Sequence, residues 1–129
     1  MSDERDPLAW AAKAEEDYAL ARASIRHKPL LAYGACFHAQ QCAEKYLKAM
    51  LVAREQTFPG IHDLLRLNAL AETAGIALPV DMTQLDKLSF YAVLTRYPGE
   101  TPTSEEAREA VKIAQEVRRF ARRMLGLRR

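Results

Sequence analysis

Apolar residues recur every three or four positions along most of this chain, which is the spacing of amphipathic helices. Prolines, glycines and capping residues divide the pattern into five segments. The predicted helices cover residues 7–26, 29–55, 61–75, 81–96 and a last stretch that starts at 103. Short connections between amphipathic helices favour antiparallel neighbours. The sequence therefore predicts an all-α fold, an up-and-down antiparallel bundle of four to five helices.

The predicted helix ends carry recognisable signals. Asp6 precedes a proline, as an N-cap followed by proline at the first helical position. The pairs Asp81 with Gln84 and Thr103 with Glu106 have the spacing of capping boxes, and Gly75 suits the position after a helix C-terminus. These signals place the boundaries where the apolar periodicity also breaks.

Composition narrows the class of protein. A length of 129 residues fits a single domain over residues 1–129, with an ordered core at about 7–126. No apolar run approaches the roughly 20 residues of a membrane span, and residues 1–6 lack a signal-peptide core. Cys36 and Cys42 would lie roughly 9 Å apart along one helix, too far to bridge. Free thiols fit a reducing compartment, so we expect a soluble cytoplasmic protein.

The helix predicted over residues 29–55 departs from simple amphipathicity. At 100° per residue one face gathers four large apolar side chains, namely Tyr33, Phe37, Leu47 and Leu51. Gln40 and Glu44 fall in that same face, where burial costs several kcal/mol unless they are paired. Either Glu44 pairs with a basic or hydroxyl group inside the bundle, or the face opens into a ligand-binding cleft.

The opposite side of this helix is unusually rich in small apolar residues: Ala35, Ala39, Cys42, Ala43, Ala49 and Ala53. A helix that is apolar on most sides lies at the centre of a bundle or at a subunit contact. This pattern motivates the hypothesis of a homodimer formed through this helix.

Two further segments carry candidate binding chemistry. Arg96 and Tyr97 stand where the fourth predicted helix ends, and arginine can clamp a phosphate while tyrosine can stack on a base. Arg96 can equally satisfy the last carbonyls of its helix. His62 and Asp63 open the third predicted helix, where Asp63 is favoured by the helix dipole and an exposed N-terminus can receive a phosphate.

Three other patterns are weaker indications of function. His38 and Cys42 have a metal-binding spacing, but no other cysteine–histidine pair completes a site, so no metal or cofactor is expected. The formal net charge of +2 does not by itself predict nucleic-acid binding. Six of the last twelve residues are arginines, which either bind RNA or an acidic partner or form a solvated cationic helix end.

Several segments together resemble the HEPN family (higher eukaryotes and prokaryotes nucleotide-binding). The resemblance is carried by WAAKAEEDYAL at 10–20, FHAQQCAEKYLKAML at 37–51, Phe58-Pro59, His62-Asp63-Leu64 and Arg96-Tyr97-Pro98. It implies a helical bundle, commonly a homodimer, often encoded beside a minimal nucleotidyltransferase in toxin–antitoxin-like pairs. The positions that match nucleotide-binding relatives are Gln40, Gln41, Glu44, Lys45, Lys48, His62, Asp63, Arg96 and Tyr97.

One departure from the family changes the functional expectation. RNA-cleaving relatives carry an arginine–histidine motif late in the bundle, but no histidine follows His62 here. Arg22 and His27 have a matching spacing in the wrong helix, which we attribute to chance. The leading hypothesis is thus a non-catalytic nucleotide- or partner-binding subunit, with no catalytic residues assigned. The alternatives are a metal-independent ribonuclease toxin, whose base would be a histidine, and a structural dimerising adaptor.

In the leading hypothesis each matched residue has an expected role. Lys45, Lys48 and Arg96 would contact phosphate or acidic groups of a partner. Tyr97 would stack on a base, and Glu44 would orient a basic residue or a ribose hydroxyl.

Overall fold

The computed structural model describes residues 3–94 and 96–128 of the chain. Its elements are a short 3-10 helix η1 (Asp3–Arg5) and the helices α1 (Pro7–Arg26), α2 (Ala32–Ala53), α3 (Leu64–Thr73), α4 (Met82–Leu94) and α5 (Ser104–Met124). No strand occurs among the residues described. The prediction of an all-α bundle of up to five helices is confirmed. None of these helices has the length and apolar character needed to cross a bilayer.

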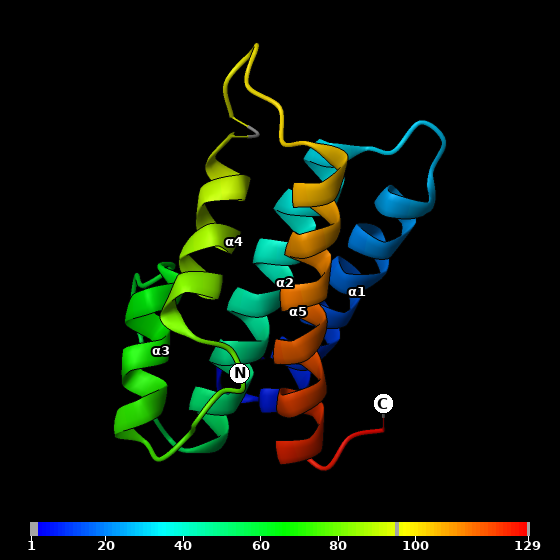
Figure 1. Cartoon of the computed structure of the whole chain (residues 1–129). Coiled ribbons are helices and arrows are strands. Elements are labelled where there is room, and N and C mark those ends of the chain that lie inside the picture. Colours follow the sequence, from blue (N-terminus) through cyan, green and yellow to red (C-terminus); the bar gives the residue numbers. More distant parts are fainter. Residues whose placement is uncertain (1–2, 95, 129) are drawn as a thin grey trace.

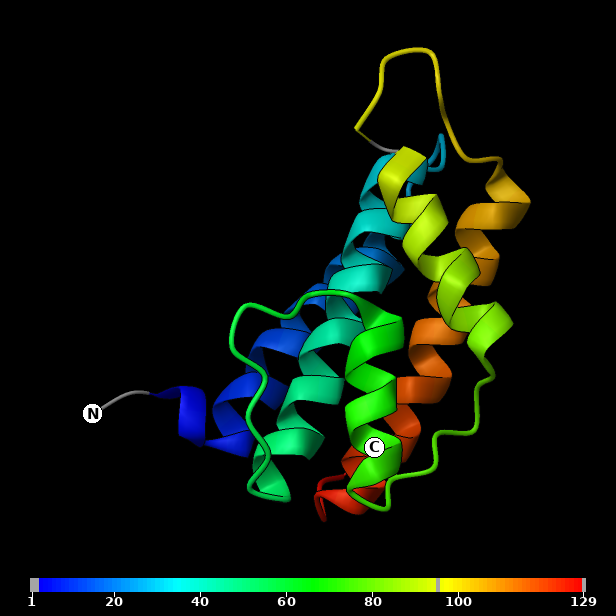
Figure 2. The ribbon, with the colours of Figure 1, turned by 90° about the vertical axis from the view of Figure 1, so that its left-hand side faces the viewer.

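Helix α2 lies at the centre of the bundle and contacts each of the other four α-helices (Figure 1). Helix α1 packs antiparallel to it along most of its length, and α5 covers its other side. Helix α4 packs on α2, α5 and α3, and it lies on the same side of the bundle as α3 (Figure 2).

Helix α3 runs parallel to α2, which departs from the strict alternation of directions that the short connections suggested. The segment that joins them returns along α2 (Figure 2). His62, just before α3, lies 3.0 Å from Glu44 in the middle of α2, whereas Arg54 at the end of α2 donates to the carbonyl oxygen of Ala74 at the end of α3. This return places the start of α3, with its histidine, beside the middle of the central helix.

The small side of α2 is buried inside the chain. Ala39 and Ala43 are 0% exposed, as are Ala14 and Ala21 of the neighbouring α1. Small side chains on both helices let their backbones approach closely, and little room is left for a second subunit. The homodimer interface proposed at Ala39 and Ala43 is therefore wrong, because those residues already contact other helices of the same chain.

The predicted caps are present. Thr103 and Glu106 form a reciprocal capping box at the start of α5, and Asp81 and Gln84 bond in the same way before α4. The helix predicted from about residue 61 begins only at Leu64, because Asp63 is its N-cap and accepts a hydrogen bond from the backbone of Leu65. Such bonds satisfy backbone N–H groups that a helix start leaves unpaired.

A polar network joins α1, α2 and α5 on the side of α2 away from α3. Glu15 accepts three hydrogen bonds from the guanidinium of Arg118, at 2.6, 2.9 and 3.1 Å, and one from the hydroxyl of Tyr46. Arg122 in turn donates to that hydroxyl. Burial alone would raise the pKa of Glu15, but the hydrogen bonds from Arg118 and Tyr46 outweigh it and lower the pKa. Two of the six C-terminal arginines are thus structural.

Candidate functional site

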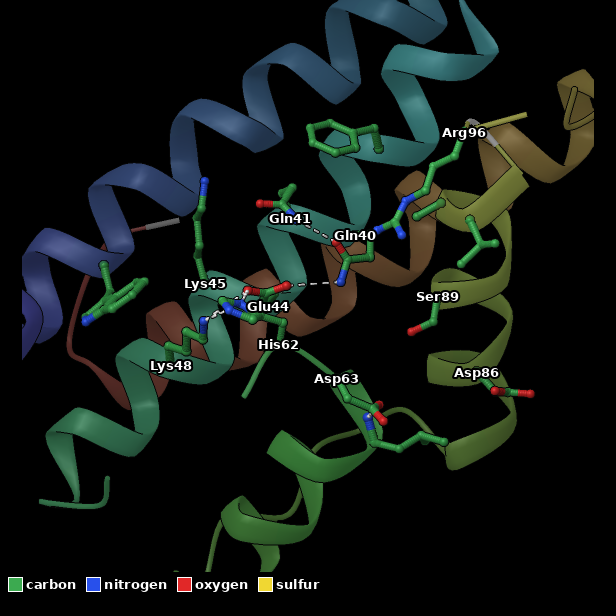
Figure 3. A pocket seen from close by; sticks show the side chains of 15 residues that line it. Gln40, Gln41, Glu44, Lys45, Lys48, His62, Asp63, Asp86, Ser89 and Arg96 are labelled. Carbon is green, nitrogen blue, oxygen red and sulfur yellow. Dashed lines mark hydrogen bonds and ion pairs between the residues drawn. The ribbon is translucent and has the colours of Figure 1, made fainter. Parts of the chain in front are cut away.

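A cavity of about 810 Å³ lies between α2, the start of α3 and α4 (Figure 3). We call it the α2–α4 cleft. Its lining residues are Trp10, Phe37, Gln40, Gln41, Glu44, Lys45, Lys48, His62, Asp63, Leu65, Asp86, Ser89, Ala92, Val93 and Arg96. Eight of the nine residues singled out from the sequence are among them. Tyr97 instead lines an adjoining depression of about 320 Å³, which shares Arg96 with the cleft.

A hydrogen-bonded chain of side chains runs along the α2 wall of the cleft. Gln41 donates to the side-chain oxygen of Gln40 at 2.8 Å, and Gln40 donates to Glu44 at 3.2 Å. The other carboxylate oxygen of Glu44 lies 3.0 Å from both the ammonium of Lys48 and Nδ1 of His62. The residues on α2 fall one helical turn apart or less, so a single helix face presents them together.

Glu44 and Lys48 form a buried ion pair. Each is only 5% exposed, and the ammonium also lies 5.3 Å from the ring centre of Trp10 and 5.5 Å from that of Phe58. The first explanation offered for Glu44 is therefore met, since the carboxylate is paired inside the bundle. Glu44 also borders a cleft, and ligand binding there stays a prediction. A charge pair removed from water in this way is stable only while both members are present.

His62 lies at the edge of this pair with 74% of its side chain exposed. Its Nδ1 is 3.0 Å from Glu44 and 3.2 Å from Lys48. When Nδ1 carries a proton it donates to the carboxylate, and when it does not it accepts from the ammonium. The imidazole is thus held at the cleft in either protonation state.

The three histidines have different partners. His27 ends α1, where its Nδ1 bonds to the carbonyl oxygen of Pro29, and His38 bonds to Asp17. Only His62 faces the α2–α4 cleft. His38 is directed to Asp17 rather than toward a shared metal with Cys42, and no group of metal-binding side chains occurs among the residues described.

Lys45 borders the cleft but its charge is engaged elsewhere. Its ammonium lies 2.6 Å from a carboxylate oxygen of Asp17 on α1, and His38 occupies the other oxygen of that carboxylate at 2.8 Å. The charge of each lysine is thus already offset by a carboxylate, that of Lys45 by Asp17 and that of Lys48 by Glu44. Both lysines were predicted as phosphate contacts, and both already have carboxylate partners within the chain.

Arg96 differs from the two lysines. It is exposed beyond the end of α4, and its guanidinium makes no hydrogen bond or ion pair with the part of the chain that the structure describes. No side-chain hydrogen bond from Arg96 to the last carbonyls of α4 occurs within residues 3–94 and 96–128. Asp86 and Ser89, one turn apart on the same helix, also face the cleft. The cleft thus offers an unpaired cation at one end and polar groups along α4.

The sequence did not reveal the contribution of α1 and α4 to the cleft. Trp10, Asp86, Ser89 and Val93 all line it. Trp10 was noted only as the first residue of the segment 10–20, and Asp86 and Ser89 have the ordinary appearance of a solvated helix face. Their part in the cleft depends on how α1 and α4 are placed against α2, for which helical periodicity offers no signal.

Taken together, these features define a small five-helix bundle whose central helix presents a polar wall to a cleft. The family model of the HEPN domain matches residues 8–124, and the chain belongs to the HEPN family. It is similar to the crystal structure of TT1696 from Thermus thermophilus, with 32% sequence identity and a TM-score of 0.68. That match covers 95% of this chain and 98% of TT1696. No curated protein matches the chain.

Proposed function

We propose that this HEPN protein binds a nucleotide in the α2–α4 cleft, as a non-catalytic subunit that acts with a minimal nucleotidyltransferase. The observation that carries the proposal is the state of the charges around the cleft. Lys45 and Lys48 are paired with carboxylates, whereas Arg96 has no partner among the residues described. An unpaired arginine at the mouth of a polar cleft is suited to a phosphate, which its planar guanidinium can bind through two hydrogen bonds.

The remaining cleft residues support a nucleoside attached to that phosphate. Phe37 and Trp10 provide aromatic surface, and Gln40, Gln41 and Ser89 provide hydrogen-bonding groups. A volume of about 810 Å³ lies in the range of small-molecule sites. Tyr97 is 58% exposed in the depression beside Arg96, where its ring can stack on a base that projects from the cleft.

Glu44 and His62 have a positioning part in this proposal. The buried carboxylate holds Lys48 and orients the imidazole. His62 and Asp63 therefore present a hydrogen-bonding edge to the ligand, although Asp63 is also the N-cap of α3. The nucleotidyltransferase partner rests on the resemblance to family members that are encoded beside such enzymes.

Calorimetric titration tests the proposal directly. Nucleoside mono-, di- and triphosphates are titrated into the purified protein, alone and with a minimal nucleotidyltransferase if one is encoded beside it. Arg96→Ala should weaken binding about tenfold to a hundredfold, since it removes a charge-assisted hydrogen bond worth about 1.5–3 kcal/mol. Arg66→Ala is the matched control, because Arg66 is exposed on α3 and does not line the cleft. Absence of heat with every nucleotide, with and without the enzyme, contradicts the proposal.

A second candidate function is metal-independent RNA cleavage, and one observation favours it. Of the three histidines, His62 is the one that shares a cleft with Arg96, and it contacts the carboxylate of Glu44. A histidine oriented by a carboxylate can act as a general base, and an arginine can stabilise a phosphorane-like transition state. Cleavage of RNA that His62→Ala abolishes and His27→Ala preserves would support it. Cleavage that survives both substitutions points to a contaminating nuclease.

A further inference from the structure

The solvent face of α5 carries a row of four cations. At 100° per residue Arg108, Lys112, Arg119 and Arg123 fall within about 60° of one another around the helix axis. All four are exposed, and they lie opposite the buried residues of the same helix. The row extends for about 22 Å along the axis. Figure 1 shows α5 between α1 and α4 with one side uncovered.

These four cations differ from the other arginines of the helix. Arg118 and Arg122 point toward α1 and α2, where they bond to Glu15 and Tyr46. No salt bridge involves a member of the row in the described part of the chain. The structure thus separates the arginines of α5 into a structural set and an exposed set, which the sequence alone did not distinguish.

The charge of the row stands out against the rest of the molecule. Taking these four charges away from the formal net charge of +2 leaves −2 for the remainder of the chain. Glu105 in the first turn of α5 and Glu116 beside the row are the acidic residues nearest to this face on the same helix. Without this row the formal net charge of the chain would be negative, so the row accounts for its positive sign.

The types of side chain exposed on this face of α5 indicate what kind of partner it binds. Large apolar side chains are exposed on α1, α2, α4 and the connections, but none is exposed on α5. Protein interfaces bury an apolar centre, which this face lacks. Proteins that bind single-stranded nucleic acid use exposed aromatic rings for base stacking, and the face offers none of these either. A linear row of cations without apolar or aromatic groups suits the regular phosphate backbone of a duplex.

We propose that the row Arg108, Lys112, Arg119 and Arg123 on α5 docks the chain on double-stranded DNA, independently of base sequence. No residue of α5 lines the α2–α4 cleft, so the surface is separate from the proposed nucleotide site. The interaction is electrostatic and releases counterions from the duplex. Failure of one proposal leaves the other unaffected.

Fluorescence anisotropy with a labelled DNA duplex at increasing salt concentration tests the proposal on the full chain. Four phosphate contacts predict a slope of about −3.6 for the logarithm of the association constant against the logarithm of the salt concentration. Arg119→Gln with Arg123→Gln should reduce the slope to about −1.8. The charge-matched control is Lys13→Gln with Arg66→Gln, two exposed cations on other helices, and it should leave the slope unchanged.

Four results would overturn the proposal. They are an absence of duplex binding at low salt, an equal loss in the control variant, tighter binding of a single strand than of the duplex, and displacement by polyglutamate as effective as by unlabelled duplex. The last of these would indicate an acidic protein partner. Circular dichroism of both double variants checks that they fold, which is expected because all four substituted side chains are exposed.

Discussion

Replacement of Lys48 by methionine removes one half of the buried ion pair at the cleft. The side chains of Glu44 and Lys48 are 7% and 6% exposed, and the ammonium lies 3.0 Å from the carboxylate. Methionine has a similar length and fills the space beside Trp10 and Phe58 without a charge. Among the residues described, the carboxylate of Glu44 is then left buried with only the amide of Gln40 and the imidazole of His62 as partners.

The expected loss is large for a domain of this size. Breaking a buried pair by removing one member costs about 3–5 kcal/mol, since the remaining charge stays desolvated. A small domain has a total stability of about 5–15 kcal/mol, so Lys48→Met should remove a large part of it. Glu44→Gln together with Lys48→Met removes both charges and should cost less than the sum of the two single variants, with a coupling of about 1–3 kcal/mol.

Urea unfolding followed by circular dichroism measures these free energies by linear extrapolation. Lys87→Met is the matched control, because Lys87 and Glu109 form an ion pair whose side chains are 48% and 42% exposed. An exposed pair of this kind contributes at most about 1 kcal/mol. If Lys48→Met costs no more than Lys87→Met, the pair is not desolvated in solution, and the buried wall of the cleft described above is incorrect.

Three further outcomes are expected. Ala39→Glu places a carboxylate at a fully buried position and should cost several kcal/mol by urea unfolding, whereas Ala12→Glu on the exposed side of α1 should cost little. The pKa of Glu15 is lowered in the folded state, so its contribution is complete above its unfolded value, near 4.5, and is lost as the pH falls through the folded value. Glu15→Gln should therefore flatten the acid limb of the stability curve, measured by urea unfolding at a series of pH values. Burial raises the pKa of the Cys36 thiol to about 12, so a thiol reagent at pH 8 should label it only after unfolding, and rapid labelling of the native protein would contradict its burial.

Local signals in the sequence were sufficient for the helices but not for their directions. The capping residues Asp6, Asp63 and Thr103 act within one turn of the chain, so their effect can be predicted without knowledge of the fold. The parallel course of α3 is accompanied by contacts between Arg54 and Ala74 and between Glu44 and His62, which join distant residues. Helical periodicity contains no information about such contacts.

The difference between local signals and long-range contacts also applies to the candidate site. The polar wall of α2 was predictable, because Gln40 and Glu44 interrupt an apolar stripe within one helix. The engagement of Lys45 was not, because its partner Asp17 lies 28 positions away on α1. The role of the small side of α2 was also ambiguous, since a central helix and a helix at a subunit contact have the same apolar pattern.

These pairings affect how the family resemblance is interpreted. Glu44, Lys45 and Lys48 belong to the helix that carries most of the resemblance, yet each is held by partners within the chain. Their replacement would weaken the fold and the cleft together, so a loss of ligand binding in such variants cannot be assigned to contact with the ligand. Arg96 has no such partner among the described residues, and Arg96→Ala should leave the free energy of unfolding within about 0.5 kcal/mol of the parent value. Loss of nucleotide binding with unchanged stability in that variant is therefore the result that locates the ligand in the cleft.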